Sequence, residues 1–344
     1  MKRIISLILC FIFIIPLTAC KDEYNKYTDY TFDYFDTVIS IIGYEKNEAD
    51  FKINSEKIKS KFQEYHKLYN IYSRYDDTQN IYSINTAEKP LTVDSKITEM
   101  LEFSKRMYSL TNSKVNVALG SVLSIWHDYR NDGINNPENA SLPPMDKLLK
   151  ANEHTNIDNL KINENEVVLN DPQMSLDVGA IAKGYAAEKT AQWMKKEGIT
   201  CYLLNAGGNI RVVGDRRDGK KWKIGLENPD GDENNPYIEF LEISDMSVVT
   251  SGSYQRFYTV NGKNYHHIID PDTLMPATGY KMVSVLTESS AVGDALSTAL
   301  FCMDIEEGKK VLENFENTYV LWVKDNGEKV YSKGFEKFIL MEEN

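Results

Sequence analysis

The chain is poor in cysteine and histidine, with four cysteines and five histidines among 344 residues. Cys10 and Cys20 lie within and directly after an N-terminal apolar run, whereas Cys201 and Cys302 are far apart in apolar segments. This spacing argues against a disulfide framework, and we expect the last two to be small core residues. The absence of HExxH and CxxC patterns argues against a zinc site.

Positive charge is also scarce. The chain has 39 lysines and arginines against 51 aspartates and glutamates, a formal charge of −12. Nucleic acid is therefore not expected as a partner, because no basic surface would neutralise its phosphates. Any anionic ligand must be bound by local means, such as a metal ion, a helix N-terminus or a single lysine.

Long apolar runs are limited to the N-terminus. Ile4 to Leu17 is almost entirely apolar, follows Lys2 and Arg3, and at about fourteen residues is shorter than the ~20 that span a bilayer. It ends in "LTAC", a lipobox arrangement that predicts cleavage before Cys20 and diacylglycerol on its thiol. An ordinary secreted protein and an uncleaved anchor are the alternatives.

The predicted organisation is a signal peptide over residues 1–19, a membrane tether over 20–29 and one domain over 30–344. Cleavage would remove Lys2 and Arg3 and no acidic residue, so the formal charge of −12 would become about −14. We expect the mature protein to be lipid-anchored at the outer face of the cell membrane.

Helices are predicted early and late in the chain, around many strands. Apolar residues at 4-3-4-3 spacing predict two early helices with buried faces to which we assign no chemistry. These residues are Ile58, Phe62, Tyr65, Tyr69 and Tyr72, then Ile97, Leu101, Ser104 and Tyr108. Residues 131–144 look like an irregular surface excursion, and from Ile157 onward strands separated by Gly, Asn and Pro turns dominate. The pattern favours a single α+β domain with largely antiparallel sheets and flanking helices.

The stretch "LDVGAIAKGYAAEKTAQWMKKEG" predicts a helix from Ala180 to Glu197, closed by Gly198 in a left-handed conformation. The turn containing Asp177 would leave free N–H groups at the helix start, which suit a phosphate. Lys183, one turn later, could neutralise an anion there. Small residues selected for close helix packing would explain the same motif.

The stretch "GDALSTALFCM" places Asp294 and Thr298 four residues apart, with Ser297 beside them. On a helix the first two point the same way, and their oxygens suit a hard cation such as Mg²⁺. The alternative is that Asp294 stabilises the helix N-terminus and Thr298 bonds to the backbone.

Two of the five histidines are adjacent in "NYHHIIDPDTLMPATGY". Strand alternation would place His267 and Ile269 on one face and His266 and Ile268 on the other, so only one histidine can face a site. A single histidine before a proline turn could act as a general base or proton shuttle. The alternative is a strand edge that tolerates imidazole.

Taken in order, "DVGAIAKGYA", "NAGGN", "TSGSYQRF", "YHHIIDPDTLMPATG" and "GDALSTALF" resemble the ApbE family of FAD:protein FMN transferases. Upstream, "FDTVISI", "YSRYDDTQNIYSIN" and "VNVALGSVLSIW" resemble further segments of that family. The resemblance covers nearly the whole mature chain and implies an ApbE-like, T-fold-related domain. The chain departs from the family at Phe35-Asp36, where Met-Gly is usual, and at Val115-Asn116-Val117, where an Asp is frequent.

The resemblance also implies site residues. Asp177 would hydrogen-bond FAD, Lys183 would reach its phosphate end, and His267 would take the proton from the attacking threonine. Mg²⁺ would be held by Ala180 (through its carbonyl), Asp294 and Thr298, with Ser297 where some relatives carry another oxygen ligand. The flavin or nucleotide would contact Phe35, Tyr75, Val115, Asn116, Val117 and Ile269.

The implied activity is Mg²⁺-dependent transfer of FMN from FAD to a threonine hydroxyl of an exported or membrane redox protein, with release of AMP. Two alternatives stay open. One is an Mg²⁺-dependent FAD pyrophosphatase that uses water in place of threonine, and the other is a non-catalytic flavin-binding lipoprotein. The sequence does not name the acceptor protein.

Overall fold

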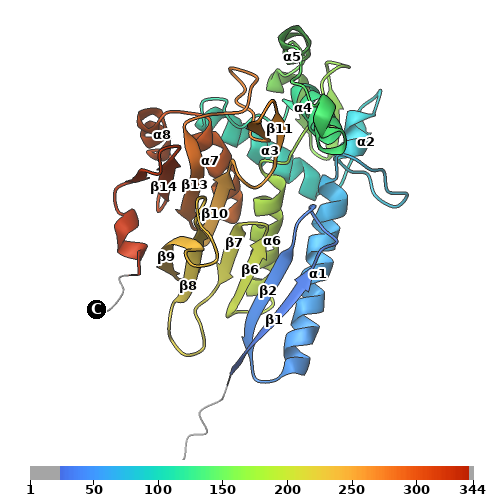
Figure 1. The fold of residues 1–344 in the computed structure, drawn as a ribbon. Helices are drawn as coiled ribbons and strands as arrows, with labels where there is room; N and C mark the ends of the chain where they lie inside the picture. The colour runs from blue at the N-terminus through green and yellow to red at the C-terminus, as the bar shows by residue number, and fades with distance from the viewer. Residues whose placement is uncertain (1–23, 341–344) are drawn as a thin grey trace, which may run out of the picture.

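The computed structural model describes residues 24–340, so the predicted signal peptide and Cys20 lie outside the described residues. An eight-stranded sheet forms the centre, in the order β1-β2-β6-β7-β10-β13-β14-β15, and every neighbouring pair is antiparallel (Figure 1). Its strands are β1 (Asn25–Thr31), β2 (Ile39–Glu45), β6 (Tyr202–Ala206), β7 (Asn209–Val213), β10 (Ser247–Gly252), β13 (Tyr280–Thr287), β14 (Tyr319–Lys324) and β15 (Lys329–Tyr331). The predicted α+β class with antiparallel sheets is confirmed.

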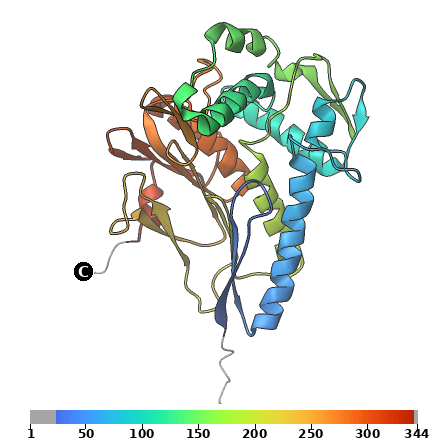
Figure 2. The ribbon, with the colours of Figure 1, turned by 45° about the vertical axis from the view of Figure 1, so that its right-hand side comes forward.

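Both faces of the sheet are covered. The helices α1 (Glu48–Tyr69), α6 (Ala182–Lys196) and α7 (Ser290–Phe301) pack on one face, and α8 (Ile305–Leu312) follows α7. On the other face a ribbon of β8 (Trp222–Glu227) and β9 (Tyr237–Ile243) encloses a second apolar core, together with the 3₁₀ helix η3 (Phe335–Phe338). The long α1 runs beside the sheet over most of its height (Figure 2).

The upper part of the molecule in Figures 1 and 2 is mainly helical. It holds α2 (Ile81–Asn85), α3 (Ser95–Leu110), α4 (Gly120–Asn135), α5 (Met145–Asn152), η1 (Pro137–Asn139) and η2 (Ile157–Asn159). The small sheets there are β3 (Leu91–Thr92) with β5 (Glu166–Leu169) and β4 (Leu160–Asn163), and the hairpin of β11 (Phe257–Val260) and β12 (Lys263–His266). A third apolar core joins α4, α5, β11 and the segment around Ile269. No helix within residues 24–340 has both the length and the apolarity needed to cross a membrane.

Three details differ from the sequence-based expectations. Residues 25–29, expected in the tether, belong to the edge strand β1; this strand is polar because most of its residues face solvent, while Tyr27 stacks on Phe51. Helix α4 continues through Asn135, so the expected irregular excursion begins later. Tyr72 does not extend the buried face of α1, because the helix ends at Tyr69 and Tyr72 is 60% exposed.

The turn between β6 and β7 needs glycine. Ala206 pairs with Asn209 across the two-residue turn of Gly207 and Gly208, both of which have positive φ (58° and 92°), as a type I′ hairpin requires. A side chain on Gly207 would also overlap the Thr37 hydroxyl. The turn therefore brings backbone close to the loop before β2, at the end of the sheet where the main cavity lies.

Candidate active site

A cavity of about 860 Å³ opens at this end of the sheet. It is bounded by the β6–β7 turn, the end of β10, the start of α6, helix α4 and the segment after β12. Most residues predicted for the site line this cavity although they are distant in sequence: Phe35, Val115, Asn116, Val117, Asp177, Ala180, Lys183, His267, Ile269, Asp294 and Thr298. Its size is that of an ordinary small-molecule site.

Asp294 is held at the crossing of α6 and α7. Its Oδ2 accepts a hydrogen bond of 2.7 Å from the Gly184 N–H, in the first turn of α6. The backbones approach closely because Gly184 has no side chain; a Cβ there would overlap the Ser290 carbonyl and the Asp294 Cβ. An amide of the helix N-terminus that we expected to bind phosphate therefore orients a carboxylate instead, and the helix dipole favours this negative charge.

The surroundings of Asp294 favour a bound cation. The carboxyl is 5% exposed, and burial raises its pKa against the opposing effects of Lys183 and the Gly184 N–H. The side chain of Asn209, which is buried at the cavity wall beside Asp294, also lowers that pKa. A buried carboxylate is stabilised in its ionised form when a cation binds beside it.

The donor set fits Mg²⁺ rather than a zinc-type ion. Within residues 24–340, no group of three or more His, Cys, Asp or Glu side chains comes together to hold a metal. Asp294 and Thr298 lie one turn apart on α7 and both line the cavity, as does Ala180. One carboxylate, one hydroxyl and one carbonyl leave positions for water and substrate phosphate, which is how proteins usually bind Mg²⁺.

The structure places Ser297 away from these donors. It is fully buried, and its hydroxyl accepts a hydrogen bond from Ser251 Oγ (2.9 Å) and donates one to the Asp294 carbonyl (3.1 Å). Ser297 is therefore not part of the cavity wall, although it lies three residues after Asp294 on the same helix.

The two adjacent histidines have different surroundings. His267 Nδ1 lies 3.2 Å from the Arg256 carbonyl, which can only accept, so Nδ1 carries the proton and Nε2 keeps its lone pair. His266 Nε2 donates to the Ala277 carbonyl (2.8 Å), and its Nδ1 accepts from the Ile268 N–H (3.2 Å). Both nitrogens of His266 are therefore hydrogen-bonded to the backbone, whereas no described residue forms a hydrogen bond with Nε2 of His267.

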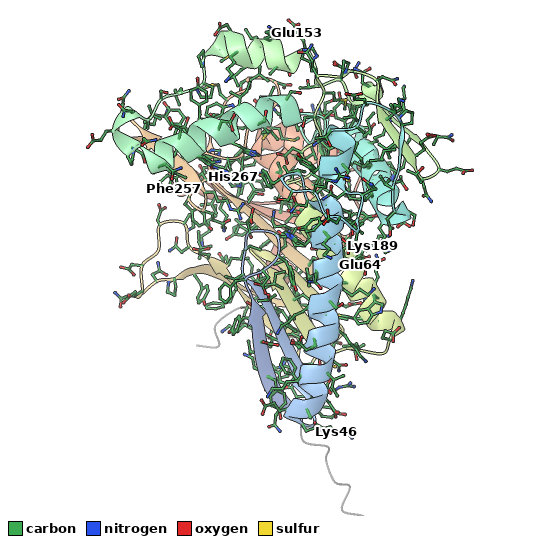
Figure 3. The ribbon with its side chains drawn as sticks, turned by 90° about the vertical axis from the view of Figure 1, so that its right-hand side faces the viewer. Lys46, Glu64, Glu153, Lys189, Phe257 and His267 are labelled. Carbon is green, nitrogen blue, oxygen red and sulfur yellow. The ribbon has the colours of Figure 1, made fainter. Side chains whose placement is uncertain are left out.

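His267 and Ile269 both line the cavity, as predicted. The predicted strand alternation is not the reason, because β12 ends at His266 and both residues lie after it. Figure 3 shows His267 beneath α4, beside Phe257 at the start of β11. Enclosure by the cavity walls, with the Lys183 ammonium as the next cause, lowers the pKa of His267. His266 points away from the cavity and into the protein, where its ring packs edge-on against Phe301 with centroids 5.5 Å apart.

Lys183 supplies positive charge in the cavity. Its Nζ lies 3.3 Å from the Gly179 carbonyl, and its charge acts on both His267 and Asp294. A lysine between the candidate metal ligands and the candidate base is placed to meet an anion there.

The Phe35 side of the cavity has an unusual backbone. Phe35 and Asp36 have positive φ (59° and 49°), and the Phe35 N–H donates to His66 Nδ1 (3.1 Å). Tyr75 does not line the cavity; its hydroxyl lies 3.4 Å from His66 Nε2. Tyr75 thus supports Phe35 through His66 instead of facing the ligand space.

Several cavity residues were not predicted. Tyr72, His127, Arg130, Asn209 and Arg256 all line the wall. Asn209 and Arg256 lie within the quoted motifs "NAGGN" and "TSGSYQRF", which could have identified them. His127 and Arg130 follow Trp126 on α4, and only the fold shows that this helix borders the cavity.

Comparisons with known proteins give a family and relatives that cover most of the chain. A sequence model described as the ApbE family matches residues 35–322. The chain is 30% identical over 295 residues to the FAD:protein FMN transferase of Vibrio cholerae, covering 85% of this chain and 86% of that protein. It is also 30% identical over 267 residues to the FAD:protein FMN transferase of Treponema pallidum, covering 73% and 72%.

Solved structures show the same fold. The ApbE protein of Thermotoga maritima superposes with a TM-score of 0.79 at 26% identity, over 93% of this chain and all of that one. The flavin transferase ApbE of Vibrio cholerae gives a TM-score of 0.75 at 26% identity, over 92% and 99%. The family predicted from the motifs is confirmed, and the chain belongs to the ApbE family.

Proposed function

We propose that the protein transfers FMN from FAD to a threonine hydroxyl of an exported or membrane protein and releases AMP, with Mg²⁺ bound at the pyrophosphate. One observation carries the proposal: Asp294 and Thr298, Lys183, and the free Nε2 of His267 line a single cavity. A metal site, an anion site and a base are what phosphoryl-type transfer to a hydroxyl requires. The names of the relatives support flavin transfer as the reaction class.

In this reaction the threonine Oγ forms a bond to the phosphorus of the FMN half. The bond from that phosphorus to the bridging oxygen breaks, and AMP leaves with the oxygen. His267 Nε2 takes the hydroxyl proton, and the Arg256 carbonyl holds the imidazole in the tautomer that keeps this nitrogen free.

Two further groups position charge in the site. The Gly184 N–H holds the Asp294 carboxylate, and Lys183 would face the negative charge of the pyrophosphate. Bound Mg²⁺ would neutralise phosphate oxygens and stabilise the charge that develops during transfer. Asp294, Thr298 and the Ala180 carbonyl are the groups that would hold it.

We further propose that the protein works outside the cytoplasmic membrane, anchored by lipid on Cys20. The support is the "LTAC" lipobox after a short apolar run. The acceptor would then be an exported or membrane protein.

The test is to incubate the purified protein with FAD, Mg²⁺ and an exported flavin-bearing redox protein that contains candidate threonines. Flavin fluorescence on the acceptor that survives denaturation, with equimolar AMP, is the expected result. Free FMN plus AMP at the same rate with and without acceptor would show a pyrophosphatase instead. Intact FAD would show a binding protein.

A further inference from the structure

One end of the cavity is formed by α4 and the loop after α1. His127 and Arg130 lie one turn apart on α4 and both line the wall. Tyr72, from the loop, faces His127 with ring centroids 6.2 Å apart and planes inclined by 49°. Tyr72 is 60% exposed, so one side of its ring is available to a ligand.

His127 also faces Asp177 without bonding to it. The distance from His127 Nε2 to Asp177 Oδ2 is 3.8 Å, too long for a hydrogen bond. Asp177 is held in place, because its Oδ1 accepts the Gly179 N–H at 2.8 Å. By comparison, the His154–Asp171 pair outside the cavity is at hydrogen-bonding distance, with Nδ1 and Oδ2 2.8 Å apart.

The two groups differ in what they offer a ligand. Asp177 Oδ2 is an acceptor. Burial lowers the pKa of His127, with Asp177 opposing and Arg130 reinforcing the shift, so the imidazole is neutral near pH 7 and can donate from one nitrogen. An acceptor and a donor side by side suit a ring edge that presents an N–H next to a ring nitrogen or carbonyl, as side chains do when they read a base edge with two hydrogen bonds.

We propose that Asp177 and His127 together read the hydrogen-bonding edge of one ring of the dinucleotide, while Tyr72 covers that ring's face. Asp177 accepts the ring's N–H, and His127 donates to the neighbouring acceptor. Both rings of FAD offer such an edge: the amino group and ring nitrogen of adenine, and the imide N–H and carbonyl of isoalloxazine. The inference rests on the proposed function and adds two recognition residues, His127 and Tyr72, to it.

The test is a set of binding measurements, with Mg²⁺ present and no acceptor, using AMP, FMN and FAD as separate probes. His127→Phe keeps an aromatic ring and removes the donor, and Tyr72→Leu removes the ring cover. His154→Phe and Tyr30→Leu are matched controls, since the first breaks a His–Asp pair and the second removes an exposed tyrosine outside the cavity. Thermal melting of each variant checks that the fold is kept.

We expect His127→Phe to weaken FAD and one of the two fragments by roughly 5–100-fold, the usual effect of removing one partner of a buried hydrogen bond. Loss confined to AMP identifies the adenine edge, and loss confined to FMN identifies isoalloxazine. For adenine, the parent should also prefer AMP over inosine monophosphate, whose edge is reversed, and His127→Phe should lose that preference.

Parent-like binding of all three probes by a folded His127→Phe would overturn the inference and leave the proposed function intact. So would equal losses in the two control variants. A parent protein that binds FAD in none of these measurements would overturn the proposed function, and the ring-edge inference with it.

Discussion

The Gly184 N–H donates to Asp294 Oδ2 over 2.7 Å and so joins the first turn of α6 to the middle of α7. Two motifs that are distant in the sequence, "DVGAIAKGYA" and "GDALSTALF", therefore form one contact between two helices at the cavity wall. The small residues of the first allow the close approach that places the carboxylate of the second at the cavity wall.

A methyl group at this crossing should disturb both stability and metal binding. In Gly184→Ala the Cβ would overlap the Ser290 carbonyl and the Asp294 Cβ, so α7 must shift. We expect a loss of about 1–3 kcal/mol in the free energy of unfolding, as for other overpacked sites, and a weaker Mg²⁺-dependent rise in the melting temperature. Urea unfolding measures the first, and thermal unfolding with and without Mg²⁺ and AMP measures the second. Lys196→Ala, on the exposed end of the same helix, is the control, and an unchanged Gly184→Ala would refute the close crossing.

Asp294 should be costly to the fold when no cation is bound. Its folded-state pKa is raised above the ordinary 3.8, so the folded protein holds this proton more tightly than the unfolded chain. Stability therefore falls as the pH rises above about 3.8 and the carboxyl ionises. We expect Asp294→Asn, measured without metal at pH 7, to melt at the same temperature as the parent or higher, with the difference shrinking toward pH 4.

The same variant should lose function. Mg²⁺ with FAD should raise the melting temperature of the parent by mass action and leave that of Asp294→Asn unchanged. FMN transfer by the variant should be abolished. Transfer that persists at saturating Mg²⁺ would show that Asp294 serves only the helix terminus.

Local patterns predicted the elements better than they predicted the site. The helix starting near Ala180 and its left-handed cap at Gly198 (φ 73°) follow from spacing and capping rules, because these are local. The same helix spacing included Tyr72, yet Asn70 ends α1 and its side chain accepts the Tyr72 N–H. The hydrogen bond to the Asn70 side chain therefore ends the helix, and Tyr72, which the periodicity predicted for the core, lies in the cavity wall instead.

Some of the site residues predicted from motifs line the cavity, and others are held elsewhere by tertiary contacts. Asp294 and Thr298 line the cavity together because the helix period places them on one side of α7, whereas His267 lies in the bend directly after β12, which ends at His266. Ser297 and Tyr75 do not line it, since their hydroxyls are engaged by Ser251 and by His66 across elements that no sequence spacing relates. His127 could not have been assigned, because the approach of α4 to Asp177 is a property of tertiary packing.

The proposed membrane anchoring depends on Cys20, which lies outside the described residues. Cys20→Ala should move the protein from the membrane fraction to the soluble or unprocessed pool, because the thiol that would receive the lipid is removed. Fractionation followed by detection of the chain measures this. Cys201→Ala, a buried core cysteine, is the matched control. Unchanged fractionation of Cys20→Ala would rule out the lipobox.

Replacing either histidine by alanine should have a different effect: one substitution should lower the transfer rate and the other the stability. His267→Ala should lower the transfer rate by on the order of 10²–10⁴, the usual contribution of a positioned proton acceptor, with FAD binding largely retained. His266→Ala should keep the rate within a few-fold but lower the free energy of unfolding by about 1–3 kcal/mol, because the Ala277 carbonyl and Ile268 N–H lose their partner. Equal rate losses in both variants would place the base elsewhere.

The pH dependence of the rate gives an independent check on His267. A base is competent only when deprotonated, and enclosure by the cavity walls, with the Lys183 charge as the next cause, lowers the pKa of this imidazole below its ordinary 6.5. The acid limb of the rate under saturating FAD should therefore lie well below pH 6.5, so the rate stays flat from pH 7 to about pH 6. Lys183→Met removes the second cause of the shift and should move the acid limb of the remaining activity to higher pH. A parent acid limb centred at or above pH 6.5, or one that Lys183→Met leaves in place, would show that His267 does not carry the proton.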